Sequence, residues 1–136
     1  MSAESPESTV LLVERDQAVR DLQGFFLKRA GLTPVFFDNG QSALDSAILS
    51  PPAVVVTEIL IPGMDGLALC RRLSEHPATR TTPVLVFSIL AAAGRAQEAG
   101  AKAFLRKPLV ESSFIDTIQE LLAAHPTEME GQWASR

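Results

Sequence analysis

The sequence predicts an α/β protein in which about five helices cover a five-stranded parallel sheet. Short runs rich in Val, Leu and Phe recur along the chain, and apolar residues at helical spacing follow most of them. Strands and helices that alternate in this way, joined by short loops, pack as a parallel sheet with right-handed crossovers. The predicted strands are 10–13, 34–37, 53–56, 83–87 and 103–105.

The helices are predicted from apolar periodicity and from the residues that end each pattern. Gly31 ends the first helix, and proline pairs or His-Pro steps end the next two, because proline cannot continue a helix. Residues 89–100 are rich in alanine and contain Gly94, so the fourth helix is expected to be weak. The first predicted helix is 17–30. The second has its apolar stripe at 43–48 and ends before Pro51, and the third is 65–76. The fourth lies within 89–100, and the last begins near Val110.

Length and composition are those of one ordinary domain. The 136 residues carry 12 basic and 16 acidic side chains, with a net charge of -4 and no run of Lys or Arg, so direct nucleic-acid binding is not expected. No apolar run reaches the roughly 18 residues of a membrane span, and we expect a soluble, cytoplasmic protein. The single cysteine, Cys70, excludes an internal disulfide and falls in an apolar helical pattern, which favours a buried core position.

The domain is expected to cover residues 9–124. Residues 1–8 are polar and are expected to be a flexible N-terminus. Residues 125–136 have no periodic pattern and are expected to be a flexible tail; Trp133 could dock on the domain or on a partner, and disorder is the preferred interpretation.

Four motifs stand in a characteristic order: VLLVERD (10–16), EILIPGMDG (58–66), PVLVFS (83–88) and AGAKAFLRKP (99–108). Together they resemble the receiver domains of two-component response regulators. The resemblance covers roughly residues 9–124 and implies the flavodoxin-like strand order 2-1-3-4-5. It also implies that side chains at the carboxyl edge of this sheet form the functional site.

The resemblance assigns a role to each position of a phosphorylation pocket. In a working receiver, acids after the first strand and an aspartate after the third hold Mg²⁺, and that aspartate accepts the phosphoryl group. Ser88 matches the hydroxyl that binds the phosphoryl group, and Lys107 matches the lysine that neutralises it. The family usually makes the peptide after this lysine cis, a form essentially confined to proline, so Lys107-Pro108 is expected to be cis.

Two positions depart from the pattern. Glu14 fits the first acidic position, but Arg15 stands where the family has a metal-ligating carboxylate, and a guanidinium has no free lone pair for a metal. Glu58 stands in place of the phosphoacceptor aspartate. We therefore expect high-affinity Mg²⁺ binding to be lost, with Glu14, Asp16 and Glu58 as residual candidate ligands. Asp16 is expected to cap the first helix.

Three interpretations of this altered pocket remain open. Glu58 could weakly imitate a phosphorylated aspartate, although it offers one charge and two oxygens where a phosphoryl group brings more. Arg15 could replace the metal and bridge Glu14 or Glu58. The substitutions could also be drift at an unused site, with Ser88 only capping the next helix and Lys107 exposed to solvent.

The expected output face also departs from the family. Typical receivers have about fifteen residues between the switch hydroxyl and the glycine before the fifth strand, whereas Ser88 to Gly100 is a separation of twelve. The fourth helix or its leading loop is therefore shortened, which places the usual mode of dimerisation in doubt. Phe104 matches the aromatic switch position, and a core phenylalanine fits equally well.

The leading hypothesis is a pseudo-receiver, a non-enzymatic protein-interaction domain that signals without aspartyl phosphorylation. Its partners would be signalling proteins, a histidine kinase or a downstream effector, and a homodimer is compatible with the sequence. The alternative is a phosphorelay protein that uses another acceptor, with Glu58, Asp16 or Thr57 as candidates. A flavodoxin-like cofactor enzyme is disfavoured, because no phosphate-cradling loop follows the first strand.

Overall fold

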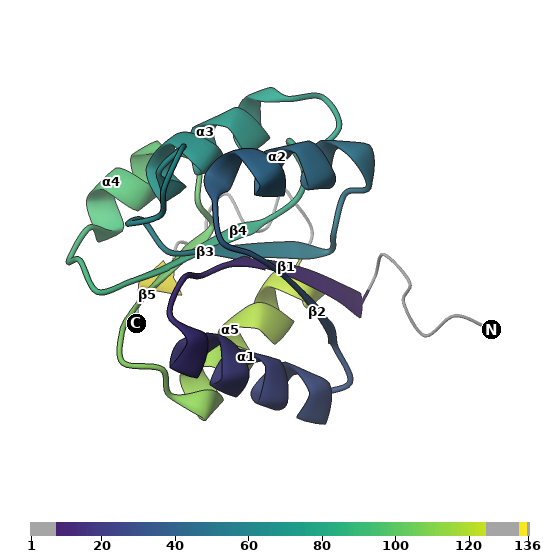
Figure 1. The fold of residues 1–136 in the computed structure, drawn as a ribbon, viewed down its shortest axis with the longest axis vertical. Helices are drawn as coiled ribbons and strands as arrows, with labels where there is room; N and C mark the ends of the chain where they lie inside the picture. Colours follow the sequence, from purple (N-terminus) through teal and green to yellow (C-terminus); the bar gives the residue numbers. More distant parts are fainter. Residues whose placement is uncertain (1–7, 125–133, 136) are drawn as a thin grey trace.

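Strands and helices alternate along the chain in a computed structural model that describes residues 8–124 and 134–135 (Figure 1). The elements, in order, are β1 (Thr9–Val13), α1 (Gln17–Arg29), β2 (Thr33–Phe37), α2 (Gly40–Leu49), β3 (Val54–Thr57), α3 (Gly66–Glu75), β4 (Val84–Ser88), α4 (Ala93–Glu98), β5 (Ala103–Arg106), α5 (Glu111–Ala123) and β6 (Ala134–Ser135). Each strand from β1 to β5 is followed by a helix, as the sequence predicts.

The strands form one parallel sheet in the order β2-β1-β3-β4-β5-β6. The predicted order 2-1-3-4-5 is therefore confirmed, and the two-residue strand β6 extends the sheet beyond β5. All five main strands carry their carboxyl ends to the same edge of the sheet, because every pairing is parallel. The loops after β1, β3, β4 and β5 meet at that edge.

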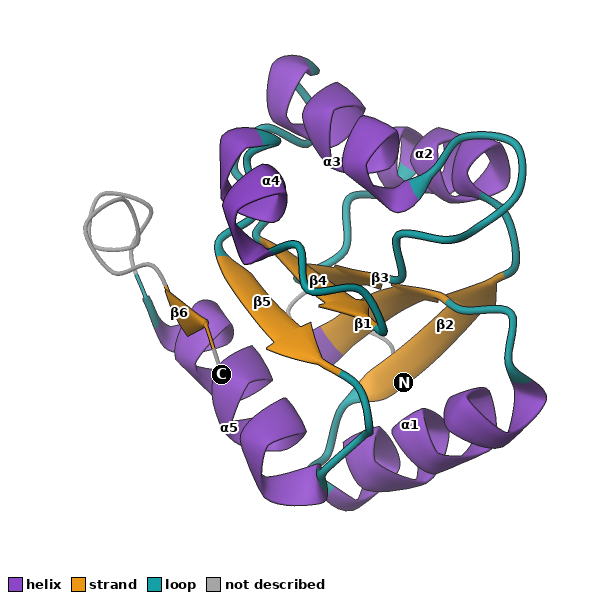
Figure 2. Ribbon diagram, turned by 90° about the vertical axis from the view of Figure 1, so that its left-hand side faces the viewer, coloured by secondary structure: helices purple, strands orange, loops and turns teal. Residues whose placement is uncertain are grey.

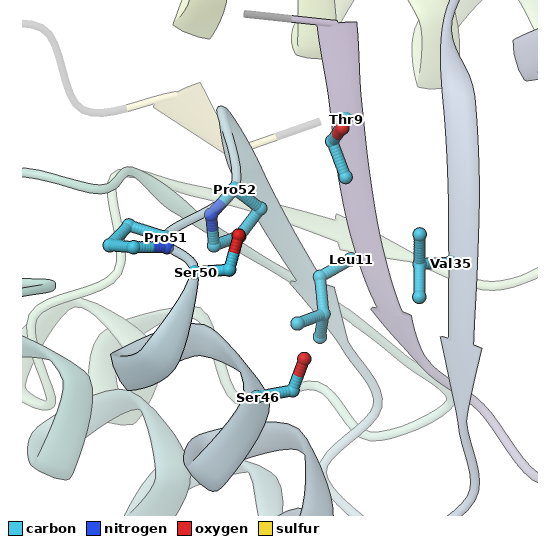
Figure 3. Close-up of a pocket in the computed structure, with 7 residues that line it drawn as sticks. All are labelled: Thr9, Leu11, Val35, Ser46, Ser50, Pro51 and Pro52. Carbon is cyan, nitrogen blue, oxygen red and sulfur yellow. The ribbon is translucent and has the colours of Figure 1, made fainter. Parts of the chain in front are cut away.

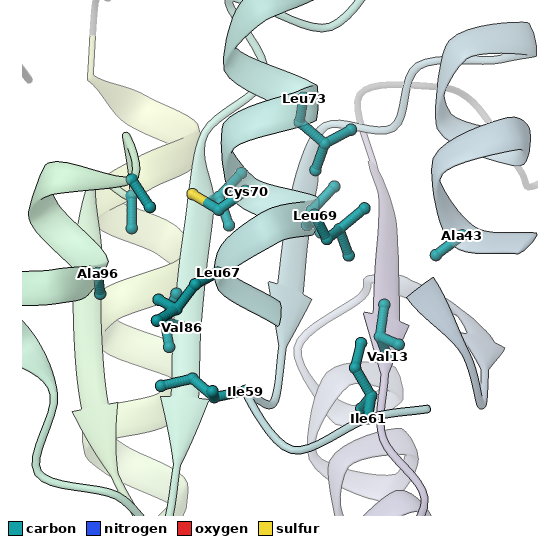
Figure 4. Close-up of a cluster of buried hydrophobic side chains, with 14 of the residues drawn as sticks. Val13, Ala43, Ile59, Ile61, Leu67, Leu69, Cys70, Leu73, Val86 and Ala96 are labelled. Carbon is teal, nitrogen blue, oxygen red and sulfur yellow. The ribbon is translucent and has the colours of Figure 1, made fainter. Parts of the chain in front are cut away.

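Two apolar cores lie on opposite faces of the sheet, each beneath one of the two helix layers that Figure 2 shows. Helices α2, α3 and α4 cover one face, where Val13, Leu69 and Val86 pack together (Figure 4). Helices α1 and α5 cover the other face, where Leu12 packs in a cluster with Phe114. Neighbouring residues of β1 enter different cores because successive side chains of a strand point to opposite faces.

Three polar side chains fix the starts of the first three helices. Asp16 accepts a hydrogen bond from the Val19 amide at 3.2 Å, which confirms its expected role as the N-cap of α1. Asn39 and Asp65 cap α2 and α3 in the same way. Asp16 and Asp65 stand in the loops after β1 and β3, so these caps also fix the loops at the carboxyl edge of the sheet.

Two residues singled out in the sequence are buried in the core that α3 covers. Cys70 has no exposed surface, and burial raises the pKa of its thiol to about 12. A thiol with that pKa is protonated at neutral pH and is a poor nucleophile. Phe104 is 3% exposed and packs in the same core, which agrees with its interpretation as a core phenylalanine.

Helix α4 is short, with six residues, and its N-cap position, Ala92, makes no side-chain hydrogen bond. Its buried side chain is Ala96, so it offers little apolar surface to the sheet. The alanine-rich composition of 89–100 and Gly94 explain this weak helix.

The predicted flexible ends fall mostly outside the described residues. Residues 1–7, 125–133 and 136 are not described, and Trp133 is among them. Ser8 precedes β1 directly, and Ala134–Ser135 forms β6. No helix in the described ranges has the length and apolar character needed to cross a membrane.

Candidate functional site

Four side chains expected in the pocket stand at the carboxyl edge of the sheet. Glu14 follows β1, Glu58 follows β3, Ser88 ends β4 and Lys107 follows β5. Backbone hydrogen bonds hold these positions: the Glu58 amide donates to the Val13 carbonyl at 3.1 Å, and the Lys107 amide donates to the Ser88 carbonyl at 2.9 Å. The parallel register therefore brings together residues that lie up to 93 positions apart in the sequence.

Both carboxylate oxygens of Glu58 are engaged. Its Oε2 accepts hydrogen bonds from the Ile59 amide at 2.6 Å, from the Leu60 amide at 3.2 Å and from the Ser88 hydroxyl. Its Oε1 lies 3.1 Å from Lys107 Nζ. Glu58 is 5% exposed, so these partners replace most of the water around its charge.

Lys107 is the cation that joins the two buried carboxylates. Its Nζ lies 3.1 Å from Oε1 of Glu14 and 3.1 Å from Oε1 of Glu58. The ammonium group also lies 5.5 Å from the centroid of the Phe87 ring, within the range of a cation–π contact. The peptide bond between Lys107 and Pro108 is cis, as expected. The interpretation of Lys107 as a solvent-exposed charge is wrong, because its side chain is 17% exposed and paired.

The structure corrects the expected role of Arg15. Arg15 is exposed, and no ion pair joins it to Glu14 or Glu58. The prediction that Arg15 bridges these carboxylates is therefore wrong, and Lys107 makes the bridge. The physical reason is that the two side chains point in different directions. Glu14 is 2% exposed and turns into the pocket, whereas Arg15 lies on the solvent side of the loop.

The charged states of Glu58 and Lys107 stabilise each other. Burial alone would raise the pKa of Glu58, but hydrogen bonds from Ser88, Lys107 and the Leu60 amide, with the Lys107 charge, lower it below its ordinary value. Burial alone would lower the pKa of Lys107, and its bonds to Glu14 and Glu58 raise it instead. At neutral pH Glu58 is therefore ionised, and its stabilising effect is lost only as the pH falls through its lowered pKa.

Ser88 connects Glu58 to the loop that leads into α4. Its hydroxyl donates to Glu58 Oε2 and accepts a hydrogen bond from the Leu90 amide at 3.2 Å. On the neighbouring strand, Arg106 Nε donates to the Ile89 carbonyl at 3.2 Å. Ser88 therefore does more than cap a helix, because it bonds the pocket carboxylate and the β4–α4 loop at once.

The remaining acceptor candidates differ in access. Thr57 has no exposed surface, and its hydroxyl donates to the Glu58 carbonyl at 2.9 Å. Asp16 is exposed, and its carboxylate caps α1 while its amide donates to Glu14 Oε2 at 3.2 Å. A phosphoryl donor in solution could therefore reach the carboxylate of Asp16, whereas the hydroxyl of Thr57 is buried.

The two backbone donors to Glu58, Ile59 and Leu60, were not anticipated from the sequence. A glycine holds their loop close to α3: the Gly66 amide donates to the Ile59 carbonyl at 2.9 Å, and a Cβ on Gly66 would lie 2.1 Å from the Glu58 carbonyl oxygen. The glycine-rich sequence after Glu58 was the available signal, because glycine allows such close approach of two backbones.

This close approach gives a first prediction. Gly66→Ala should lower the free energy of unfolding by about 1–3 kcal/mol, as overpacking does, because the new methyl group meets backbone that cannot swing aside. Gly94→Ala is the matched control, since a Cβ there meets nothing within 4 Å, and it should stabilise α4 by up to about 1 kcal/mol. Urea unfolding followed by circular dichroism would measure both; equal stability of Gly66→Ala and the parent chain would contradict this account of the loop.

A separate cavity of about 200 Å³ lies at the opposite edge of the sheet (Figure 3). It lies beside the start of β1 and the loop before β3. No ionisable side chain lines it, so it lacks the chemistry of the carboxyl edge. The lining residues are Thr9, Leu11, Val35, Ser46, Ser50, Pro51 and Pro52.

The donor set at the carboxyl edge does not fit a resident Mg²⁺ ion. Mg²⁺ prefers octahedral oxygen ligands, and here Glu58 uses both oxygens on protein donors while Lys107 lies against Glu14 and Glu58. Within residues 8–124 and 134–135, no three His, Cys, Asp or Glu side chains lie close enough together to hold a metal ion. The three candidate ligands Glu14, Asp16 and Glu58 therefore do not form such a group.

The doubly wound sheet, with carboxylates, a hydroxyl and a lysine at its carboxyl edge, has the architecture of a signalling receiver. Comparison with known families agrees: the model described as the response regulator receiver domain matches residues 10–119. The chain belongs to the response regulator receiver domain family.

Relatives and solved structures show how far the similarity extends. NtrC of Escherichia coli K12, a DNA-binding transcriptional regulator, is 36% identical over 100 residues, which are 73% of this chain and 21% of NtrC. The transcriptional regulatory protein CseB of Streptomyces coelicolor is 29% identical over 85% of this chain and 50% of CseB. The receiver domain of a signal transduction histidine kinase from Syntrophus aciditrophicus superimposes with a TM-score of 0.80 at 30% identity, covering 85% of this chain and 90% of that one. The chain thus spans about a fifth to a half of the length of these two curated relatives.

Proposed function

We propose that this receiver domain is a pseudo-receiver, a protein-interaction module of two-component signalling that works without aspartyl phosphorylation. The observation that carries the proposal is the closed network of Glu14, Glu58, Ser88 and Lys107. In this network each group that would contact a metal or a phosphoryl group already bonds another protein group. The domain would act through the surfaces that the network stabilises, as a signalling module and not as an enzyme.

Charge balance supports the same proposal. Lys107 sits between two buried carboxylates, so no divalent cation is needed to hold Glu14 and Glu58 together. Arg15 adds a positive charge at the position where the family resemblance implies a ligand, and a guanidinium repels a metal ion. A domain with such a pocket would keep a single conformation. Its binding to a partner would then depend on the amount of the domain and not on phosphorylation.

The partners proposed are signalling proteins, a histidine kinase or a downstream effector. This proposal draws on family membership and on relatives such as NtrC, whose receiver-like region is one part of a longer DNA-binding regulator. Direct nucleic-acid binding by the domain itself is not proposed, because its net charge is -4.

The test is a titration of the wild-type chain with Mg²⁺ and then with beryllofluoride, a phosphoryl mimic, followed by amide NMR. The expected result is no saturable shift at the amides of Glu14, Glu58, Ser88 and Lys107, because their side chains are already bonded to one another. Saturable shifts at these amides would show that the pocket opens to metal and phosphoryl groups, and would overturn the proposal.

The alternative is a phosphorelay protein with a non-standard acceptor, Glu58, Asp16 or Thr57. Its specific support is the exposed carboxylate of Asp16. Incubation with a small-molecule phosphoryl donor, followed by mass spectrometry, separates the two functions: no added phosphoryl mass is expected, whereas a modified Asp16, Glu58 or Thr57 would favour the alternative.

A further inference from the structure

The outer face of α1 carries an apolar stripe at coiled-coil spacing. Ala18, Leu22 and Phe25 follow one another at intervals of four and three residues, the spacing of a helix seam that packs on another helix, and Arg29 continues this spacing four residues further on. Leu22 is 48% exposed and Phe25 is 55% exposed. The opposite face of the helix, which carries Leu27 and the partly buried Val19 and Phe26, packs against the rest of the domain.

No described element covers this stripe. In Figures 1 and 2, α1 lies in the same layer as α5, with the sheet on its inner side and α5 beside it. Within the domain Phe25 meets Phe26 at 6.0 Å between ring centroids, and the Arg29 guanidinium lies 5.4 Å from the Phe25 ring. These contacts still leave more than half of the Phe25 surface exposed.

Exposed charges on α1 identify the partner that fits the stripe. Asp21 and Lys28 are both exposed, lie seven residues apart and therefore flank the same side of the seam. In an antiparallel pair of α1 helices centred on Phe25, Asp21 of each copy faces Lys28 and Arg29 of the other. A parallel pair would instead bring residue 21 of one copy to residue 26 of the other, so Asp21 would face Phe26 and not a basic residue.

We infer that the outer face of α1 binds a second copy of this chain, in an antiparallel, two-fold symmetric helix pair centred on Phe25. A two-fold interface uses the same patch on both copies, so the patch must complement itself, and the charges of α1 meet this condition. Arg29 already pairs with Glu111 at 3.4 Å, so Lys28, which makes no ion pair with another described residue, is the main partner for Asp21. This inference does not depend on the chemistry of the pocket.

The expected association is weak. Helix α1 has 13 residues, and a contact limited to its outer face lies at the small end of protein interfaces, which is typical of transient complexes. Sedimentation velocity on the full chain, from about 10 µM to about 1 mM, should therefore show a concentration-dependent shift from monomer to dimer. A chain that remains monomeric over this range overturns the inference.

The apolar stripe is tested by Phe25→Asp, which should abolish the dimer because it places two carboxylates against each other at the two-fold axis. Leu49→Asp is the matched control: Leu49 is 88% exposed and ends α2, away from α1, so the dimer should persist. Circular dichroism checks that both variants are folded. A dimer that survives Phe25→Asp uses another surface, and this result would also overturn the inference.

The antiparallel orientation is tested by charge reversal. Asp21→Lys alone and Lys28→Glu alone should each weaken the dimer at least tenfold, because each creates two like-charged contacts across the axis. An equimolar mixture of the two variants should associate again, since both contacts between positions 21 and 28 in the mixed dimer then join opposite charges. Failure of the mixture to associate, with both variants folded, would exclude the antiparallel pair.

Discussion

Replacing Lys107 by methionine should lower the free energy of unfolding by about 3–5 kcal/mol, the usual cost of removing one partner from a buried ion pair. Methionine retains a flexible apolar stem beside Phe87 but leaves Glu14 and Glu58, at 2% and 5% exposure, without their cation. Urea unfolding followed by circular dichroism at neutral pH measures the loss. The loss should shrink as the pH is lowered, because protonated carboxyls no longer need the ammonium group.

Two further variants separate the ion pairs from simple packing. Lys102→Met removes a lysine that makes no ion pair in the described part of the chain, and its effect should stay within about 0.5 kcal/mol. Glu58→Gln added to Lys107→Met should recover part of the stability, because one of the two uncompensated charges is then gone. A Lys107→Met protein as stable as the parent would show that the carboxylates do not depend on this lysine.

The double variant Arg15→Asp with Glu58→Asp should gain both Mg²⁺ binding and phosphoryl uptake. Aspartate at position 15 supplies the carboxylate that the family resemblance implies, and the shorter side chain at position 58 withdraws from Ser88 and Lys107, leaving them to bind a phosphoryl group. Saturable Mg²⁺ shifts in amide NMR and added mass after a small-molecule phosphoryl donor are the readouts.

The single variants show which substitution closes the pocket. Glu58→Asp alone should bind Mg²⁺ weakly because Arg15 remains, and Arg15→Asp alone should keep Glu58 bonded to Ser88 and Lys107. A double variant that folds normally but takes up neither Mg²⁺ nor phosphoryl groups would refute the explanation of the pocket by these two residues. The short helix α4 would then be the next feature to examine.

Short apolar runs followed by helical patterns predicted a parallel sheet, and the resemblance to receiver domains implied its strand order. Element ends differ by one or a few residues: β2 begins at Thr33 instead of 34, and β3 runs to Thr57 instead of 56. Such shifts are expected where end residues have similar propensities and backbone pairing decides the boundary. Strand β6 is too short to give a periodic pattern, so no sequence signal could have predicted it.

The candidate site was predicted less completely than the fold. The parallel order of the strands was enough to bring Glu14, Glu58, Ser88 and Lys107 to one edge. The direction of Arg15 was not predictable, because two adjacent residues in a loop can turn one side chain inward and the next toward solvent. The amide donors of Ile59 and Leu60 depend on the path of the loop, which is determined by close backbone contact at Gly66 and not by any side chain.

The burial of Cys70 makes the domain convenient for site-specific labelling. The sequence contains one cysteine, which lies on the buried face of α3 without exposed surface, and its thiol is protonated at neutral pH. Maleimide reagents attack thiolates at accessible positions, so the folded protein should stay unmodified without any substitution of this residue. A cysteine introduced on the outer face of α1 would then carry a spin label or fluorophore alone, and distances between copies could be read from that position.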